Sequence, residues 1–224
     1  MFMEGIVLIN SDIRKLALCG WLKTYNKPVY NNPKKLHIFL FFYECFSKVE
    51  NDNPDFNSLV WNINGPVFLN VWIDYTKNRD EFDEKSVRAY EEHTELICSN
   101  RVETSNFIVS ILTENELLAL IQAMNIWSCK NSEISSDTQQ TMLYEKDFND
   151  TDFHIINTLK LMYPIEMIRN TKIVELNEHY FIMTKSDFAK LNSELMAELS
   201  TVSHYPNTHN PIYVELFKNK LIID

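Results

Sequence analysis

The sequence predicts a mainly α-helical protein that carries a small C-terminal α+β extension containing a β-hairpin. Only three glycines occur in 224 residues, which disfavours glycine-rich phosphate loops and Rossmann turns. Apolar residues at helical spacing repeatedly follow Asn, Asp, Ser or Thr, the residues that cap helices. Runs of strand-forming residues stand out in 172–184 and 211–223. We therefore expect a helical domain over residues 1–146 and an α+β extension over residues 147–224.

The first two predicted helices cover residues 12–25 and 34–49. Gly20 lies inside the first, where it would allow another helix to pack closely. Asn32 followed by Pro33 is a helix start, with Asn as N-cap and Pro at the first helical position. The helix over 34–49 is apolar nearly all round, so we expect it at the centre of a bundle.

Three further helices follow in the predicted order. Pro66 suits a first helical position and predicts a helix that ends near Lys77. Asp83 caps the next, over residues 84–100, and Thr104 or Ser105 begins a short one.

A capping box and a polar helix complete the predicted helical domain. Thr113 and Glu116 have the T-x-x-E spacing in which each residue satisfies the other's backbone N–H, and an apolar helical run follows them. Ser135 or Ser136 then begins a polar helix that we expect to reach about Lys146.

The extension is predicted to mix helices and strands. A helix ends at Pro164, a β-hairpin turns at Asn177–Glu178, and Ser186–Asp187 begin another helix. Residues 211–223 form either one strand or a tight pair around Lys218–Asn219. A strand at a sheet edge could accept a strand from a partner protein, although a sheet paired internally is the favoured reading.

Charge and cysteine usage narrow the class of partner and the compartment. The net charge is −10 and the pI about 5.1, which disfavours direct nucleic-acid binding because such binding needs a basic surface. Leu36–Phe46, the most apolar run, is far shorter than a membrane span, so we expect no membrane association. Four separated cysteines, Cys19, Cys45, Cys98 and Cys129, are read as free thiols in a reducing environment. These features predict a cytoplasmic protein.

No arrangement typical of an active site is visible in the sequence. No H-E-x-x-H, zinc-spaced Cys/His set or G-x-S-x-G is present, so we expect no metal, no cofactor and no enzymatic activity. His37, inside an aromatic run, is read as a core histidine whose hydrogen bonds are satisfied. One alternative is a hydrolase or transferase that uses His93, or His204 with His209, beside nearby carboxylates, and it requires these groups to meet in a cleft.

The stretch 61–68, WNINGPVF, contains one of the three glycines. Pro66 restricts Gly65 away from the α region, and glycine reaches backbone geometries that a residue with a Cβ avoids. We expect Gly65 to permit a sharp turn that Trp61 and Val67 hold against the helix 34–49.

The order of these elements over residues 12–140 resembles the Panacea domain, a helical domain of prophage and bacterial toxin–antitoxin systems. In that family a helix of the form K-L-x-K-L-L-Y-F precedes W-x-x-G-P-V, a charged helix and a capped helix that ends near a Trp. The most specific corresponding positions here are Trp61, Gly65, Pro66, Val67 and Trp72, with three residues between Trp61 and Gly65. The chain departs from the family pattern by having His and Ile after the first Lys-Leu pair, and residues 147–224 lie outside the resemblance.

The resemblance implies an antitoxin that neutralises a cognate toxin by direct protein–protein contact, without catalytic residues. The five matching residues would build the scaffold, and the extension would choose the partner. The alternative hypothesis is a phage-encoded inhibitor of a host defence complex, whose acidic surface would block a basic site.

Overall fold

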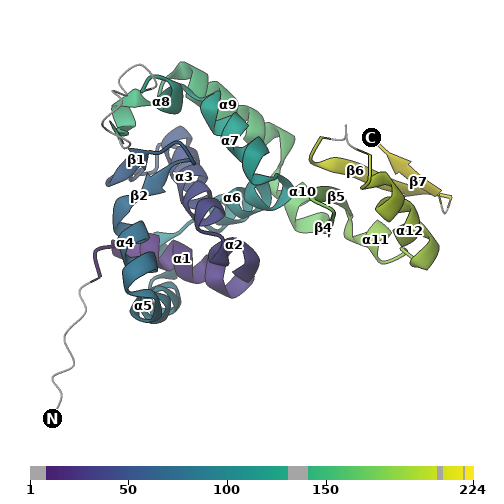
Figure 1. Ribbon diagram of the computed structural model, residues 1–224, viewed down its shortest axis with the longest axis horizontal. Coiled ribbons are helices and arrows are strands. Elements are labelled where there is room, and N and C mark those ends of the chain that lie inside the picture. Colours follow the sequence, from purple (N-terminus) through teal and green to yellow (C-terminus); the bar gives the residue numbers. More distant parts are fainter. Residues whose placement is uncertain (1–8, 131–140, 206–208, 219) are drawn as a thin grey trace, which may run out of the picture.

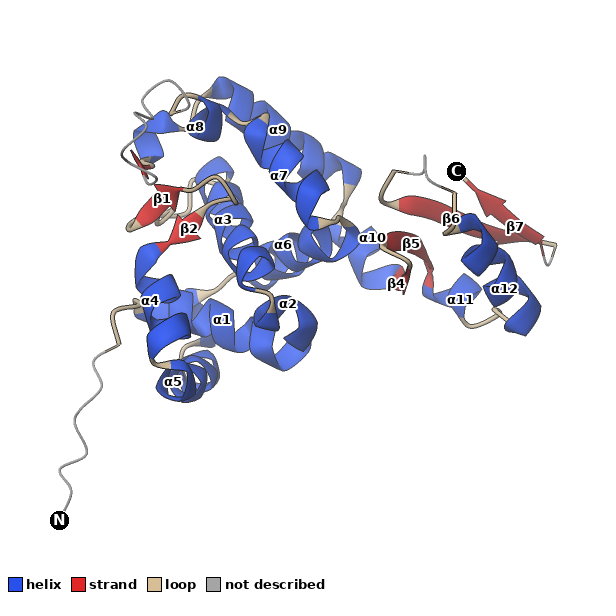
Figure 2. Cartoon of the chain, viewed as in Figure 1, coloured by secondary structure: helices blue, strands red, loops and turns tan. Residues whose placement is uncertain are grey.

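The structure is a computed structural model that describes residues 9–130, 141–205, 209–218 and 220–224 (Figure 1). The predicted mainly α fold is wrong, because the described residues form a mixed α/β structure with two sheets (Figure 2). One sheet has three strands in the order β2-β1-β3, and the other has four in the order β4-β5-β6-β7. The predicted division into residues 1–146 and 147–224 stays a prediction.

Helices make up most of the first 130 residues. They are α1 (Ile13–Tyr25), α2 (Lys27–Asn31), α3 (Pro33–Val49), α4 (Leu69–Lys77), α5 (Arg79–Glu92), the 3-10 turn η1 (Thr94–Leu96), α6 (Ser99–Ile111), α7 (Glu114–Gln122) and α8 (Asn125–Ser128).

The central helix α3 confirms the prediction made from its apolar sequence. Residues 36–47 are all buried, and α3 contacts α1, α2, α6, α7 and the later helix α9 (Asp150–Met162) (Figure 1). The side chain of Asn32 accepts a hydrogen bond from the backbone N–H of Lys35, and Pro33 occupies the first helical position, both as expected.

The small sheet β2-β1-β3 was missed by the sequence reading. Its strands are β1 (Leu59–Trp61), β2 (Val67–Phe68) and β3 (Thr141–Met142), all antiparallel. Strands of two or three residues are too short to show a period-2 pattern. The helix expected from Pro66 therefore begins only at Leu69, because Val67 and Phe68 pair with β1.

Two other predicted helices have different bounds. The helix expected over 84–100 is divided into α5 and α6, because the chain becomes extended at Ile97 and Cys98. Thr104 and Ser105, one of which was expected to begin a short helix, instead lie inside α6. Of the polar helix expected from Ser135 or Ser136, residues 135–140 lie outside the described residues, and the rest forms β3 and the 3-10 turn η2 (Glu145–Asp147).

The C-terminal elements lie at one end of the molecule and are reached through α10 (Ile165–Asn170) (Figure 1). They are β4 (Thr171–Leu176), β5 (His179–Thr184), α11 (Lys185–Phe188), α12 (Ser193–Val202), β6 (Ile212–Phe217) and β7 (Lys220–Ile223).

The predicted β-hairpin is confirmed. β4 and β5 pair antiparallel, and Asn177 and Glu178 both have positive φ, 50° and 64°, as a two-residue hairpin turn requires. β6 and β7 form the tight antiparallel pair that was one of the two expectations for residues 211–223. β5 and β6 run parallel, and α11 and α12 lie between them in the chain.

Two hydrophobic clusters stabilise these layers. The larger surrounds α3 and includes Ile156 and Leu159 of α9 and Tyr180 and Ile182 of β5. The smaller lies in the C-terminal part, where Leu199 packs among residues of β5 and β6. Because β5 contributes to both clusters, side-chain packing as well as the connecting chain holds the four-stranded sheet against the helices.

Candidate functional sites

The Gly-Pro stretch forms the connection between β1 and β2. The backbone N–H of Gly65 donates to the carbonyl of Asn62 at 2.8 Å, and the Asn62 side chain accepts from the N–H of Asn64 at 3.0 Å. Gly65 has φ +122°, a conformation that residues with a Cβ rarely adopt. Gly65 therefore permits a sharp turn, as expected, but this turn joins two strands.

Trp61 faces the core. Its side chain is 9% exposed, and its ring centroid lies 5.2 Å from that of Trp127. The β1–β2 connection also approaches α3, because Ile38 is the side chain nearest to Gly65. The ring contact of Trp61 is thus with Trp127 of α8, and the scaffold role of the motif residues stays a prediction.

Pro66, Val67 and Trp72 instead line a cavity of about 290 Å³, here called the motif pocket. Its remaining walls come from the first turns of α3 and from the β1–β2 connection: Pro33, Lys34, His37, Asn62 and Asn64. Trp72, on α4, is 41% exposed. Three of the five motif residues therefore border a surface cavity.

His37 has unusual hydrogen bonding in this pocket. The side chain is 1% exposed, and its Nδ1 accepts from the backbone N–H of Phe68 at 3.2 Å. Its Nε2 is buried and has no hydrogen-bond partner among the described residues. Burial lowers the pKa of His37 to about 3, so the ring is neutral at physiological pH. The expectation of a satisfied core histidine is wrong for Nε2.

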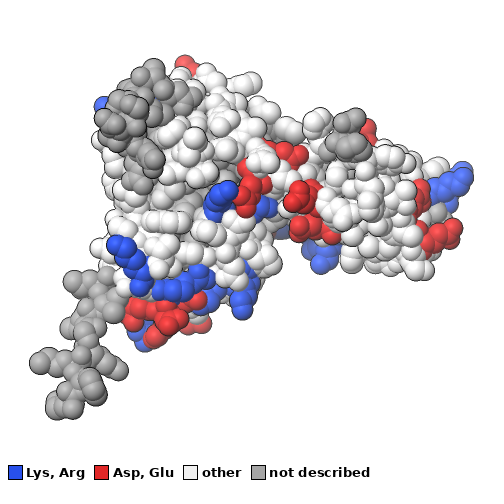
Figure 3. Space-filling model, viewed as in Figure 1, with Lys and Arg blue, Asp and Glu red and all other residues white. Residues whose placement is uncertain are grey.

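A second and larger cavity, of about 730 Å³, lies between the helices and the C-terminal sheet and is here called the junction cleft. The ionisable side chains of its wall, apart from Tyr180, are Lys35, Glu114, Glu175 and Glu178. Amide and hydroxyl groups of Asn26, Asn32 and Ser110 also line it. Figure 3 shows red acidic surface on both sides of the junction between the two parts of the molecule.

Lys35 is held at the wall of the junction cleft. Its Nζ donates to the carbonyl of Leu112 at 2.9 Å and to the Tyr180 hydroxyl at 3.4 Å, and it lies 5.1 Å from the Tyr180 ring centroid. Burial lowers the pKa of Lys35, against the opposing effect of nearby glutamates, with Glu175 the largest. Burial, followed by Glu175 and Glu178, raises the pKa of Tyr180 to about 12. Lys35 is thus a partly buried ammonium in a cleft whose wall also carries Glu114, Glu175 and Glu178.

The junction cleft and the motif pocket are neighbours. Lys34 lines the motif pocket and forms an ion pair of 2.9 Å with Glu114, which lines the junction cleft. Asn32, the N-cap of α3, donates to Glu114 at 2.7 Å. The first turn of α3 therefore separates two cavities that one protein partner could cover together.

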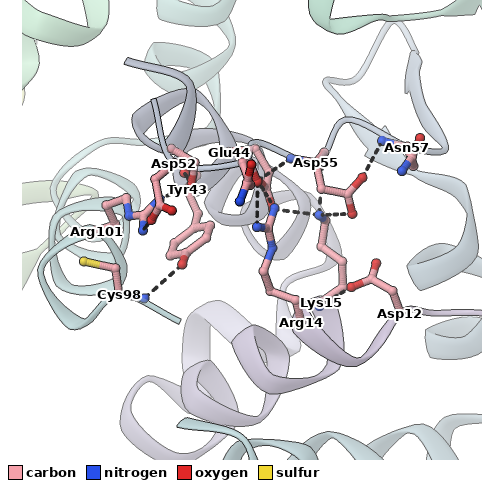
Figure 4. Close-up of polar contacts among 12 residues, drawn as sticks. Asp12, Arg14, Lys15, Tyr43, Glu44, Asp52, Asp55, Asn57, Cys98 and Arg101 are labelled. Atoms are coloured by element: carbon pink, nitrogen blue, oxygen red, sulfur yellow. Dashed lines mark hydrogen bonds and ion pairs between the residues drawn. The ribbon is translucent and has the colours of Figure 1, made fainter. Parts of the chain in front are cut away.

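A buried ion cluster joins α1, α3 and the loop after α3 (Figure 4). Lys15 Nζ donates to Glu44 Oε1 at 2.7 Å and to Asp55 Oδ2 at 3.0 Å. Glu44 also accepts from Arg14 at 2.5 Å and from the backbone N–H of Asp55 at 2.8 Å. Because the charged groups in this cluster are paired, we interpret it as structural.

A second buried cation lies beside this cluster (Figure 4). Arg101 donates to the Ser47 hydroxyl at 2.6 Å and pairs with Asp52, and its guanidinium lies 5.2 Å from the Tyr43 ring centroid. The Tyr43 hydroxyl accepts from the N–H of Cys98 at 3.0 Å. These contacts fix the start of α6 against α3.

The histidines of the catalytic alternative lie outside both cavities. His93, just after α5, is partly exposed, and its Nδ1 lies 3.3 Å from Glu95 Oε1. His204 is exposed, and its Nδ1 lies 2.6 Å from the carbonyl of Ser200. His209 is also exposed. The two cavities therefore give no support to a mechanism that uses these side chains.

The described residues contain neither a metal-ligand cluster nor a membrane-spanning helix. No group of three or more His, Cys, Asp or Glu in the described ranges is arranged to hold a metal ion. Within the same ranges, no helix combines the length and apolar character needed to cross a bilayer. Cys19 and Cys45 are buried free thiols, and Cys98 and Cys129 are partly exposed.

The sequence reading missed the residues of the junction cleft. Lys35 and Glu114 lie 79 positions apart, and Glu175 is a further 61 positions away. No local spacing connects them, because the docking of a sheet on a helix bundle brings them together. The available signal was the predicted hairpin, whose turn and first strand carry Glu178 and Glu175.

Comparison with known proteins identifies no relative of this chain. No family model, no curated protein and no solved structure matches it. The resemblance of residues 12–140 to the Panacea domain therefore stays a prediction that rests on the motif residues.

Proposed function

We propose that this chain is an antitoxin-like protein that neutralises a partner protein by direct contact, without catalysis, and that it binds a basic segment of the partner in the junction cleft. The observation that carries the proposal is the composition of that cleft, whose wall carries three carboxylates, Glu114, Glu175 and Glu178, and one ammonium, Lys35. A lysine or arginine side chain entering there gains the exposed carboxylates of Glu175 and Glu178 as partners, since Glu114 is already paired with Lys34.

The position of the cleft also suits partner recognition. Helix α7 supplies Glu114 from the part of the chain that resembles the Panacea domain, and the β4–β5 hairpin supplies Glu175 and Glu178. The cleft therefore has one wall from the helical part and one from the C-terminal sheet. This agrees with the expectation that the extension selects the partner.

The defence-inhibitor alternative draws less support from the charge distribution. On α5, the most acidic helix, Asp83 pairs with both Lys23 and Arg79, and Glu81 pairs with Lys85. Paired charges make a mixed surface, which Figure 3 shows as adjacent red and blue atoms below the helical part. A surface that imitates nucleic acid instead needs unpaired carboxylates in regular succession.

The test begins with the genes beside this one in its source genome. Each is induced alone and together with this gene, and growth is measured. We expect one neighbour to stop growth alone and this protein to restore growth. If no neighbour is toxic, or if a toxic neighbour is not neutralised, the antitoxin proposal is wrong.

The cleft is then tested with a double charge reversal, Glu175→Lys with Glu178→Lys. The same charge change on α12, Glu194→Lys with Glu198→Lys, provides the matched control, since these side chains are also exposed. We expect the cleft variant to bind the partner at least about tenfold more weakly and the control to bind normally. Equal affinity for the two variants, with unchanged thermal unfolding, would place the contact elsewhere.

A further inference from the structure

The unpartnered nitrogen of His37 has a defined protonation state. Its Nδ1 accepts from the N–H of Phe68, so Nδ1 has no proton of its own in the neutral ring. Burial lowers the pKa of His37 to about 3, which keeps the ring neutral. The single proton is therefore on Nε2, and this N–H is a buried donor without an acceptor.

A buried donor without an acceptor destabilises the free protein, and a ligand that supplies the acceptor removes that penalty. His37 lines the motif pocket, where the Trp72 ring centroid lies 5.9 Å from that of the imidazole. Pro33, Pro66 and Val67 give the pocket apolar walls. The site therefore combines an apolar lining, an aromatic side chain and one hydrogen-bond donor.

We infer that the motif pocket binds a tyrosine side chain of the partner protein, with the phenol oxygen accepting a hydrogen bond from His37 Nε2. Tyrosine is the neutral side chain that combines an aromatic ring with an oxygen acceptor. A carboxylate fits less well because the imidazole is neutral and Lys34 is already paired with Glu114. The cavity volume of about 290 Å³ suits one aromatic side chain.

Binding requires a small movement of Trp72. The imidazole is 1% exposed and its Nε2 is buried, whereas the neighbouring Trp72 is 41% exposed. The tyrosine ring then packs against the displaced indole.

That the tyrosine belongs to a partner protein rests on the proposed function. The motif pocket and the junction cleft are connected through the Lys34–Glu114 ion pair. A partner whose basic segment occupies the junction cleft has the motif pocket on the other side of the first turn of α3. A basic residue and a tyrosine close together on the partner surface would fill both.

The test compares two probes that differ by one hydroxyl group, N-acetyl-tyrosinamide and N-acetyl-phenylalaninamide. Both are titrated into the full chain while the ring nitrogens of His37 are followed by NMR. We expect the tyrosine probe to bind roughly fivefold more tightly and to shift the Nε2 signal. Equal affinity for the two probes, or a tyrosine complex with an unmoved Nε2 signal, would overturn the inference.

Two further arms complete the experiment. His37→Phe should remove the preference for the tyrosine probe, whereas His93→Phe, at a partly exposed position outside the motif pocket, should keep it. The NMR comparison on the native chain decides the matter if His37→Phe does not fold. Binding of p-cresol without binding of N-acetyl-tyrosinamide would indicate a free phenol and overturn a protein partner. Because the probes do not involve the partner, probe binding without growth rescue would reject only the antitoxin role.

Discussion

His37 illustrates how burial at a single residue creates both a binding feature and a pH dependence. The same low-polarity surroundings that leave Nε2 without a partner also disfavour the charged ring, lowering its pKa to about 3. In the unfolded chain a histidine has a pKa near 6.5. The folded state therefore binds fewer protons than the unfolded state between about pH 3 and pH 6.5.

Neutral His37 makes the folded protein less stable as the pH falls. The contribution of neutral His37 is fully present above the unfolded pKa and is lost as the pH falls toward 3. We expect this group to reduce the free energy of unfolding by about 2 kcal/mol between pH 7 and pH 5. Urea unfolding at both pH values should show this loss in the native chain and in His93→Phe. An equal loss in His37→Phe would show that other groups cause it.

Gly65 is a second residue at which local geometry decides the outcome. A Cβ there would lie 3.9 Å from Ile38 Cδ1, an ordinary contact, so steric crowding is small. The cost of substitution comes from φ +122° instead. We expect Gly65→Val to lower the free energy of unfolding by about 1–3 kcal/mol. Thermal unfolding checks this against Ile63→Val in the same connection, which should be nearly neutral since Ile63 is 71% exposed.

At the scale of elements, Gly20 decides how closely α1 and α5 pack. A Cβ at this position would lie 2.0 Å from the carbonyl oxygen of Ser86 and 2.6 Å from its carbonyl carbon. Both atoms belong to the α5 backbone, which cannot move aside as a flexible side chain could. The sequence expectation that another helix approaches at Gly20 is confirmed.

Gly20→Ala should therefore force α1 and α5 apart. We expect a loss of about 1–3 kcal/mol in the free energy of unfolding, despite the higher helix propensity of alanine. Ser200→Ala, at a partly exposed position of α12, provides a helical control and should change stability little. An unchanged midpoint for Gly20→Ala in urea would contradict the close packing of these two helices.

At the scale of the whole molecule, Asn210 connects the helical part to the C-terminal sheet. Its backbone N–H donates to Glu116 at 3.1 Å, and its Nδ2 donates to Glu116 at 3.0 Å and to the carbonyl of Glu178 at 3.0 Å. Its Oδ1 accepts from the N–H of Tyr180 at 2.8 Å. Glu116 thus serves both the predicted capping box of α7 and the junction.

Asn210→Ala should loosen the junction cleft. Because it removes three side-chain hydrogen bonds, we expect the free energy of unfolding to fall by about 2 kcal/mol and backbone amide exchange in β5 to accelerate. Asn115→Ala, an exposed position on the cleft wall, is the control for loss of an amide group. Unchanged exchange in β5 would mean that the packing of Tyr180 and Ile182 alone fixes the sheet.

Much of the secondary structure could be predicted from the sequence. The cap Asn32–Pro33, the box Thr113–Glu116 and the turn Asn177–Glu178 act over three or four residues, and the structure has all three. The buried helix α3 was visible from its apolar composition. These features depend on neighbours in the chain, so the sequence contains them directly.

The small sheet, the split of residues 84–100 and both cavities could not be predicted in this way. β1, β2 and β3 are too short for a periodic pattern, and they form because residues 60 and 142 meet across the molecule. The unpartnered Nε2 of His37 depends on Phe68 and Trp72 packing around it, and the junction cleft depends on the docking of the sheet.

The sequence by itself thus determined the buried helix α3, the caps at Asn32 and Thr113, the hairpin and the acidic balance, because local backbone preferences and side-chain charge decide them. Only the tertiary structure decided which carboxylates share a cleft and which of the motif residues border a pocket. The physical reason is that burial and long-range contact set the environment of a side chain, and residues as distant as Lys35 and Glu175 acquire a common environment only when the chain has folded.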